Sequence, residues 1–367
     1  MIPCRANPHG GTRLHNGGMP RLVLATLAAS VPMGLQVYER EVSQRAQAAL
    51  GGGADVSTCV TRTLRSPLPG DRRVPGWLLR TAPPAVRRAA GALLYGRATA
   101  VHRMGLSLPP ARVPEILTIH DTVAWRFPDE TPPEPFAATD ARRAAAVISV
   151  SRFAADDVAE RLGLDHVHAI PNGVDERFFD ATPLDAAALA ALGVVGPYVL
   201  HAGGSTLRKN LEGLAAAWPS VRSAVPGVTL VLAGPPSSRR DALFGSLPGA
   251  VRVGRVPDEI VPGLVAAAAA VAVPSLYEGF GLPALEAMAA GVPLVAANRS
   301  SLPEVVGDAG TLVEPDGTAL AEGLVHALRR DGEVTAAVER GRARARRFSW
   351  DVSAARHAQV WRSVLGC

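Results

Sequence analysis

Residues 278–286 read Glu-Gly-Phe-Gly-Leu-Pro-Ala-Leu-Glu. The short apolar run 271–275 before this stretch is typical of a buried strand. Pro283 suits the first turn of a helix, and Gly291 suits the residue that ends it. The segment is therefore predicted to be a strand, a glycine-rich turn and a helix N-terminus. This is the unit from which parallel α/β sheets are built.

The turn itself has the chemistry of an anion and sugar site. Backbone N–H groups of Phe280, Gly281 and Leu282 are expected to point unpaired into the space above the sheet, where they can bind phosphate. Glu278 lies in the turn and Glu286 about one turn into the helix, so both carboxylates can accept hydrogen bonds from sugar hydroxyls. An ordinary turn with two solvated glutamates is the alternative. Two glutamates that bracket this turn favour a ligand site.

Lys209 is the only lysine among the 38 basic side chains of the chain. It follows an apolar run at 198–202 and a Gly203-Gly204 turn, and a helix is predicted to begin near Asn210, a good N-cap residue. Arg208 and Lys209 therefore precede a helix N-terminus, where an ammonium and a guanidinium can together neutralise a diphosphate. A polar loop with two solvated cations is the alternative, chiefly for Arg208.

Other short motifs follow the same order as in one known family. With the Gly-Gly turn, the Arg-Lys pair and the Glu-x7-Glu motif, the chain resembles the retaining family 4 glycosyltransferases of the GT-B fold. The resemblance extends from about residue 110 to the C-terminus and is greatest for the polysaccharide mannosyltransferase branch. The supporting motifs are Thr118-Ile-His-Asp121, Ser149-Val-Ser151, Ile170-Pro-Asn-Gly-Val-Asp175, Ser301-Leu-Pro-Glu-Val305 and Phe348-Ser-Trp350.

Apolar runs alternate with helical patterns along the whole chain, which predicts parallel sheets covered on both faces. The resemblance implies two Rossmann-like α/β domains that face each other across a cleft, with a C-terminal helix crossing back to the first domain. Strands are expected near 21–27, 56–60, 116–120, 146–150, 167–170, 197–202, 228–233, 250–253, 270–274 and 293–296. The expected parts are a disordered tail (1–18), an acceptor-side N-terminal domain (19–175), a linker (176–196), a nucleotide-sugar-binding domain (197–350) and the returning helix (351–367).

The resemblance also assigns roles to residues. Glu278 would contact donor-sugar hydroxyls, Glu286 the ribose, and the amides of 280–282 the sugar and phosphate. His120 would approach the donor sugar from the N-domain; its alternative is a surface histidine at a strand end. Catalytic roles are implied for His120, Glu278, Lys209 and Arg208, and donor contacts also for Gly203, Gly204, Phe280, Gly281, Leu282 and Glu286.

The acceptor side is implied less directly. Asp121 is a candidate for handling the acceptor hydroxyl, and Gly34 belongs to the loop after the first strand. Family members carry a Gly-Gly pair in that loop, whereas residues 30–35 read Ser-Val-Pro-Met-Gly-Leu, with a single glycine. Backbone approach to the donor phosphate from this side is therefore in question.

Departure of a diphosphate requires a divalent metal or fixed cations and amides. The chain has no Asp-x-Asp pair, the metal handle of the other major glycosyltransferase fold. We therefore expect no metal and no cofactor. Retention of anomeric configuration, with the leaving phosphate helping to deprotonate the acceptor, is implied by the resemblance alone.

Composition places the chain among globular proteins: 48% of its 367 residues are hydrophobic and 19% charged. Cys4, Cys59 and Cys367 offer neither metal-ligand spacing nor a disulfide framework, which favours a reducing cytoplasm. No apolar run reaches the length of a membrane span. Residues 21–30 imitate a signal peptide but are equally typical of a first buried strand, the interpretation that we prefer, and Met19 is a candidate for the true start.

Residues 56–114 contain ten arginines and one acid, a formal net charge of +9 in a chain whose total is +5. A helix over 85–99 is predicted to gather Val86, Ala89, Ala90, Leu93 and Leu94 on one side. The segment is interpreted as a surface for an anionic membrane or a phosphate-linked acceptor, or else as an arginine-biased solvated surface. No nucleic-acid motif accompanies the charge, so nucleic-acid binding is not expected.

The predicted function is transfer of a sugar, mannose by branch resemblance, from a nucleotide diphosphate sugar such as GDP-mannose to a glycan or lipid-linked acceptor. Such a reaction belongs to cell-envelope or exopolysaccharide synthesis in the cytoplasm. Two alternatives remain open: a catalytically inactive GT-B scaffold subunit, and another GT-B enzyme, either a sugar-nucleotide epimerase or a sugar-phosphate synthase.

Overall fold

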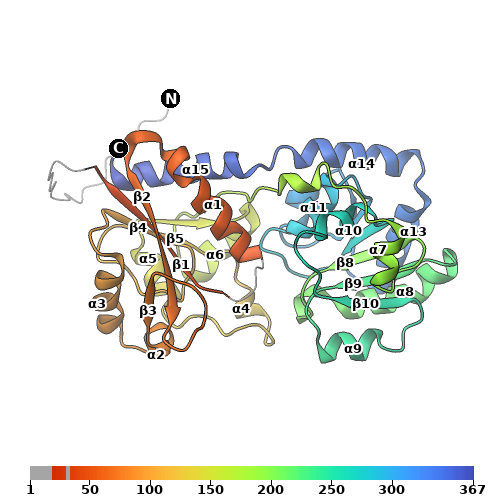
Figure 1. Cartoon of the computed structure of the whole chain (residues 1–367), viewed down its shortest axis with the longest axis horizontal. Coiled ribbons are helices and arrows are strands. Elements are labelled where there is room, and N and C mark those ends of the chain that lie inside the picture. The colour runs from red at the N-terminus through yellow and green to blue at the C-terminus, as the bar shows by residue number, and fades with distance from the viewer. Residues whose placement is uncertain (1–18, 30–33) are drawn as a thin grey trace.

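Two parallel sheets organise the chain, one in each domain (Figure 1). The computed structural model describes residues 19–29 and 34–367. The expected tail 1–18 and most of the 30–35 loop lie outside the described residues. The seven-stranded sheet has the order β3-β2-β1-β4-β5-β6-β7, and the six-stranded sheet the order β10-β9-β8-β11-β12-β13. Both are doubly wound α/β arrangements, so the predicted fold class is confirmed.

The N-domain sheet is covered by helices on both faces. Its strands are β1 (Arg21–Leu27), β2 (Asp55–Thr63), β3 (Arg72–Val74), β4 (Ala100–Arg103), β5 (Glu115–Thr118), β6 (Ala146–Ser149) and β7 (His168–Ala169). Its helices are α1 (Gly34–Leu50), η1 (Gly51–Gly53), α2 (Gly76–Arg80), α3 (Pro84–Tyr95), α4 (Val123–Arg126), α5 (Ala137–Arg143) and α6 (Arg152–Leu162).

The C-domain follows a junction that holds η2 (Glu176–Phe178) and α7 (Ala186–Ala191). Its strands are β8 (Tyr198–Ala202), β9 (Thr229–Ala233), β10 (Ala250–Gly254), β11 (Ala270–Val273), β12 (Leu294–Ala297) and β13 (Thr311–Val313). Its helices are η3 (Leu207–Lys209), α8 (Leu211–Ala224), α9 (Ser238–Phe244), α10 (Val261–Ala266), α11 (Leu282–Ala289), α12 (Leu302–Val306), α13 (Gly317–Arg329) and α14 (Gly332–Ala345).

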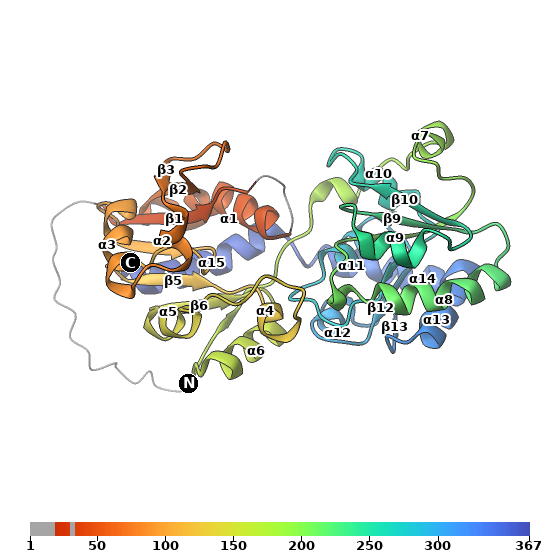
Figure 2. The ribbon, with the colours of Figure 1, turned by 90° about the horizontal axis from the view of Figure 1, so that it is seen from below.

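The last helix, α15 (Trp350–Leu365), crosses back over the N-domain (Figures 1 and 2). A chain of buried hydrogen bonds fixes it there. The indole N–H of Trp361 donates to Nδ1 of His102 at 3.1 Å, and the hydroxyl of Tyr38 on α1 lies 2.8 Å from Nε2 of His357. The hydroxyl of Thr118 on β5 links these two hydrogen bonds, because it lies 2.8 Å from both the Tyr38 hydroxyl and Nε2 of His102. The predicted returning helix is confirmed.

Three strands were not predicted from the sequence: β3, β4 and β13. β4 reads Ala-Val-His-Arg, so half of it is polar, yet all four residues are buried. His102 is satisfied by the hydrogen-bond chain described above, and Arg103 pairs with Glu115 at 2.7 Å and with Asp140 at 3.1 Å. β3 and β13 are three-residue edge strands, too short for an apolar pattern to indicate them.

Candidate active site

Lys209 and Glu278 meet because their loops leave neighbouring strands. β8 pairs with β11 in the middle of the C-domain sheet, where the strand order reverses. Loops that follow the carboxyl ends of strands at such a switch point form the ligand crevice of an open α/β sheet. The loop after β8 carries Arg208 and Lys209, and the loop after β11 carries Glu278.

These three side chains form one cluster of ion pairs. Lys209 Nζ lies 2.5 Å from Oε1 of Glu278, and a guanidinium nitrogen of Arg208 lies 3.0 Å from Oε2. The hydroxyl of Ser275 donates to Oε1 at 2.8 Å. Lys209 and Glu278 are both buried, and Arg208 is largely so. The alternative of solvated cations in a polar loop is therefore wrong for Arg208 as well as for Lys209.

The cluster fixes the charge of the carboxylate. Burial by itself would raise the pKa of Glu278, but Lys209 and Arg208 more than offset it and lower that pKa to about 2. Burial also lowers the pKa of the Lys209 ammonium, against the attraction of Glu278. Glu278 is thus ionised at neutral pH and holds both cations at the crevice.

The glycine-rich turn passes very close to the N-domain. A Cβ added to Gly279 would lie 2.8 Å from the carbonyl oxygen of His120, so a larger residue would separate the domains here. Gly281 is the N-cap of α11 with φ +103°, a left-handed conformation that favours glycine. Within the described residues, the backbone N–H groups of Phe280, Gly281 and Leu282 have no hydrogen-bond acceptor, as predicted for an anion site.

His120 and Asp121 face this turn from the N-domain, two and three residues beyond the end of β5. Burial lowers the pKa of His120 to about 4, although a hydrogen bond to the backbone of Met104 opposes the shift. Nε2 of His120 is buried and has no partner among the described residues. His120 is therefore a neutral imidazole with a free acceptor nitrogen, on a residue that is partly exposed beyond the strand end. Burial raises the pKa of the Asp121 carboxyl.

Glu286 lies apart from the ion-pair cluster, in a cavity at the domain junction. Leu282 and Glu286 of α11, Arg40 of α1, Arg177 and Asp258 all line it. Burial, together with the nearby carboxylates of Asp175 and Asp258, raises the pKa of Glu286 to about 7. This carboxyl can therefore change its protonation state near neutral pH.

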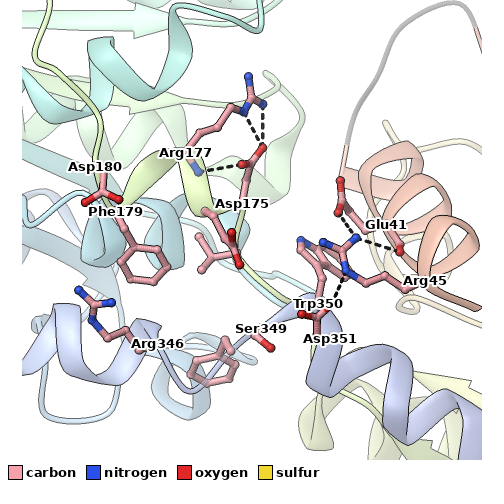
Figure 3. A pocket seen from close by; sticks show the side chains of 13 residues that line it. Glu41, Arg45, Asp175, Arg177, Phe179, Asp180, Arg346, Ser349, Trp350 and Asp351 are labelled. Atoms are coloured by element: carbon pink, nitrogen blue, oxygen red, sulfur yellow. Dashed lines mark hydrogen bonds and ion pairs between the residues drawn. The ribbon is translucent and has the colours of Figure 1, made fainter. Parts of the chain in front are cut away.

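A larger cavity of about 580 Å³ adjoins the Glu286 cavity and shares Asp175, Arg177 and Trp350 with it (Figure 3). Two sets of ion pairs border it. Arg177 binds Asp175 at 2.7 Å, and Arg45 of α1 binds Asp351 of α15 at the same distance. Charged side chains from both domains therefore converge on the junction beside Glu286.

The remaining predicted residues also lie around the crevice. Gly34 is the first residue of α1, and a Cβ added to it would lie 3.5 Å from Cδ1 of Leu282, so α1 begins opposite α11. A Cβ on Gly203 would lie 3.8 Å from Lys209 Nζ. Buried Arg240, which the sequence did not single out, donates to the carbonyls of Gly203 at 2.8 Å and Gly204 at 3.3 Å and so fixes the Gly-Gly turn.

Two N-domain carboxylates were also not anticipated. Glu130 accepts a hydrogen bond from Nε of Arg208 at 2.8 Å, and Asp129 accepts from the backbone N–H of Leu207 at 2.6 Å. The acidic pair therefore crosses the crevice and binds η3, which carries the predicted diphosphate cations. No residue pattern near 127–130 indicates this contact, because it depends on how the domains face each other.

The basic segment 56–114 is only partly a surface. Arg87 is buried, donates to the carbonyls of Leu79 at 2.7 Å and Leu108 at 3.1 Å, and lies 3.8 Å from Asp140. Arg103 is buried as well. On α3 the buried side holds Arg87, Gly91, Leu94 and Tyr95. Of the apolar residues predicted to share one side, Val86, Ala89 and Leu93 are exposed.

The described residues contain no group of three or more histidine, cysteine, aspartate or glutamate side chains arranged to hold a metal ion. Among the same residues, no helix is both long enough and apolar enough to span a membrane.

Two Rossmann-like domains that face each other, with a C-terminal helix returning to the first, define the GT-B class. Solved structures of this shape include a sucrose-phosphate synthase from Thermosynechococcus elongatus (TM-score 0.72, 23% identity, 95% of this chain and 99% of that one). WaaG, a glycosyltransferase involved in lipopolysaccharide biosynthesis, is also similar (TM-score 0.66, 17% identity, 92% and 99%). At these identities the likeness concerns the fold alone.

Residues 17–178 match the family model described as Glycosyltransferase Family 4, and residues 196–330 match that described as Glycosyl transferases group 1. The two matches cover the greater part of both domains. The chain belongs to the family 4 glycosyltransferases, as its motifs predict.

Several curated relatives are mannosyltransferases. The O-antigen chain mannosyltransferase B of Escherichia coli is 42% identical over 165 residues, which are 42% of this chain and 42% of that protein. The phosphatidyl-myo-inositol mannosyltransferase of Mycolicibacterium smegmatis is 33% identical over 231 residues, 59% of this chain and 58% of that protein. The chain thus spans about half the length of the curated relatives it matches.

Proposed function

We propose that this chain is a retaining mannosyltransferase. It moves mannose from a nucleotide diphosphate sugar, GDP-mannose, to a glycan or lipid-linked acceptor in cell-envelope or exopolysaccharide synthesis. Membership in the family supports the reaction class. The mannosyltransferases among the relatives support the sugar.

One observation carries the proposal: a buried cluster of two cations and a carboxylate lies where the glycine-rich turn meets the loop of His120. Arg208 and Lys209 are placed to neutralise the diphosphate as it leaves, and the unpaired amides of 280–282 to bind its oxygens. Such groups stabilise charge that develops in the transition state, which is where a transferase gains rate. Glu278 orients the cations and accepts from sugar hydroxyls.

The other residues complete the donor site. The free Nε2 atom of His120 can accept a hydrogen bond from a sugar hydroxyl on the N-domain side. Glu286, in the cavity beside α1, accepts from the ribose. Asp121 faces the same turn and handles the acceptor hydroxyl. Fixed cations and amides take the place of a metal, so the reaction needs neither a divalent ion nor a cofactor.

The acceptor requires a further surface. We place the enzyme in the cytoplasm, peripheral to the inner face of the membrane, where a lipid-linked acceptor would be presented. Exposed Trp77 of α2 and Leu93 of α3 lie within the basic segment 56–114, among exposed arginines. Aromatic and aliphatic side chains surrounded by cations are typical of peripheral membrane contact.

A panel of nucleotide sugars tests the proposal. Purified protein is mixed with GDP-mannose, GDP-glucose, UDP-glucose or UDP-galactose, and thermal stabilisation and release of the nucleoside diphosphate are measured. We expect GDP-mannose to give the largest rise in Tm and the fastest release, and Glu278→Ala to lose the release. Equal responses to all donors would contradict the mannose assignment, and no response to any would contradict the transferase assignment.

A further inference from the structure

Tyr277 belongs to the C-domain but is bound by the N-domain. Its side chain is 4% exposed, although it lies in a loop immediately before Glu278. Its ring makes edge contacts with two N-domain phenylalanines, at 5.4 Å from Phe153 and 6.2 Å from Phe127. A loop aromatic buried in the opposite domain is a specific interdomain contact.

The hydroxyl of Tyr277 both donates and accepts hydrogen bonds with groups of the N-domain. It donates to Oδ2 of Asp157 on α6 at 2.7 Å and accepts from the backbone N–H of Thr122 at 3.3 Å. Thr122 is two residues after His120. One phenolic oxygen therefore links the Glu278 loop directly to the loop that carries His120.

Asp157, which accepts the hydrogen bond from Tyr277, is held in place by other hydrogen bonds. Its carboxylate also receives the hydroxyl of Thr122 and the guanidinium of Arg126. Burial would raise the pKa of Asp157, but these bonds and the one from Tyr277 lower it. An ionised, buried acceptor makes the hydrogen bond from Tyr277 a charge-assisted one, roughly twice as strong as a neutral one.

Gly279, on the other side of Glu278 in the chain, is also bound by the N-domain. The hydroxyl of Ser151 donates to the carbonyl oxygen of Gly279 at 2.6 Å, while it also caps α6 by accepting from the N–H of Ala154. Both chain neighbours of Glu278 are therefore fastened to the N-domain. Glu278 itself makes its ion pairs with the C-domain.

We propose that Tyr277 is a positioning residue that fastens the Glu278 loop to the N-domain when the domains close. The ion pairs of Glu278 lie within the C-domain, so closure sets how this loop meets the loop of His120. The inference rests on the proposed function in that Glu278 serves the donor. Loss of the phenolic hydroxyl should favour an open form in which donor still binds the C-domain but transfer is slow.

Tyr277→Phe tests this, because it keeps the buried ring and removes only the hydroxyl. Tyr198→Phe is the matched control: Tyr198 is equally buried, but its hydroxyl donates at 2.5 Å to the carbonyl of Leu264 within the C-domain. We expect Tyr277→Phe to lower kcat about 10-fold or more with a smaller change in the KM for donor, since a hydrogen bond to a charged group is lost. Tyr198→Phe should keep wild-type kcat.

A second readout needs no sugar nucleotide. Spin labels at Ala89→Cys on α3 and Glu322→Cys on α13, with Cys4 and Cys367 replaced by serine, report the distance between the domains by double electron–electron resonance. We expect Tyr277→Phe to shift this distribution to longer distances and Tyr198→Phe to leave it unchanged. A wild-type distribution in Tyr277→Phe, or the same shift in Tyr198→Phe, would overturn the proposal. If the wild-type protein turns over no nucleotide sugar, the proposed function fails, and the distance comparison still decides the role of Tyr277.

Discussion

Lys209 and Glu278 are 69 residues apart in the chain, yet Nζ of one lies 2.5 Å from Oε1 of the other. The two side chains therefore act as a unit. Glu278 holds the ammonium at the crevice before any ligand arrives, and Lys209 keeps Glu278 ionised. Preorganisation of this kind avoids reorientation of charges at the moment of reaction.

Replacement of Lys209 by alanine should lower kcat/KM by about 100-fold or more, because the charge that grows on the leaving diphosphate loses its fixed cation. Steady-state kinetics with the best donor from the panel give the value. Near-normal turnover by a folded Lys209→Ala enzyme would contradict the role given to this lysine.

Stability must be separated from catalysis in that experiment. Removing one partner of a buried ion pair typically costs about 3–5 kcal/mol, because the other charge is left uncompensated. Arg208 and Ser275 still bind Glu278 and should reduce this cost. The double variant Lys209→Met with Glu278→Gln has no unpaired charge at this position. We expect it to recover most of the lost stability without recovering activity.

Donor affinity should depend on pH through Glu286, whose pKa is raised from 4.5 to about 7. Below that pH the carboxyl is protonated, and above it the carboxylate accepts two hydrogen bonds from the ribose. If only the carboxylate binds well, affinity should rise up to about 10-fold from pH 6 to pH 8. Isothermal titration at both pH values measures this. Glu286→Gln should bind more weakly with no such dependence, and the same dependence in that variant would point to another group.

The raised pKa of Glu286 also makes the stability of the fold depend on pH. A carboxyl with a raised folded-state pKa stabilises the fold in its protonated form. That contribution is full below pH 4.5 and is lost as the pH rises through about 7. Glu286→Gln should therefore unfold with a flatter pH dependence across this window.

The sequence predicted the individual site segments because each follows an apolar strand with turn residues at its end. It could not predict that Lys209 and Glu278 pair, because pairing depends on which strands are neighbours in the sheet. The contacts of Glu130 and Tyr277 are even harder to predict from the sequence. They require both domains to be folded and closed, and no local pattern indicates them.

Buried polar residues account for the other errors. β4 was missed because His102 and Arg103 do not look like core residues, although ion pairs and hydrogen bonds satisfy them inside the domain. On α3 the sequence did not indicate that Arg87 faces the interior. Gly91 packs against the backbone of Pro110, where an added Cβ would lie 2.0 Å from the carbonyl oxygen, and this contact turns Arg87 inward.

Glu130 should weaken donor binding in the wild-type protein, because its carboxylate occupies Nε of Arg208 at 2.8 Å. A diphosphate must displace it to use that guanidinium fully. Glu130→Gln should therefore bind a nucleoside diphosphate about threefold or more tightly. Glu134→Gln is the control, since Glu134 lies in the same loop but accepts from Ser107 within the N-domain. Weaker binding by Glu130→Gln would show instead that the carboxylate serves domain closure.

Transfer should continue in excess EDTA at a rate within about twofold of the untreated enzyme, because cations and amides of the protein oppose the leaving charge. Product formation is followed with and without chelator, after dialysis. An activity that EDTA abolishes and that magnesium or manganese restores would contradict the metal-independent mechanism.

The exposed part of the basic segment should bind anionic vesicles and not neutral ones. Six of its arginines are exposed: Arg65, Arg72, Arg73, Arg80, Arg97 and Arg112. Trp77 is 54% and Leu93 82% exposed beside them in the sequence. Each cation near an anionic surface contributes about 1 kcal/mol of binding free energy, and the attraction decays within a Debye length, so the protein should leave the vesicles as salt rises.

Arg87 is unsuitable as a probe because it is buried. Arg80→Glu with Arg97→Glu should reduce vesicle sedimentation, whereas Arg329→Glu with Arg347→Glu, exposed in the C-domain part of the chain, should not. Release of the nucleoside diphosphate from the donor should be unchanged in both variants, because the donor site lies at the crevice. Equal partitioning onto neutral and anionic vesicles, or none onto either, would identify the segment as an arginine-biased solvated surface.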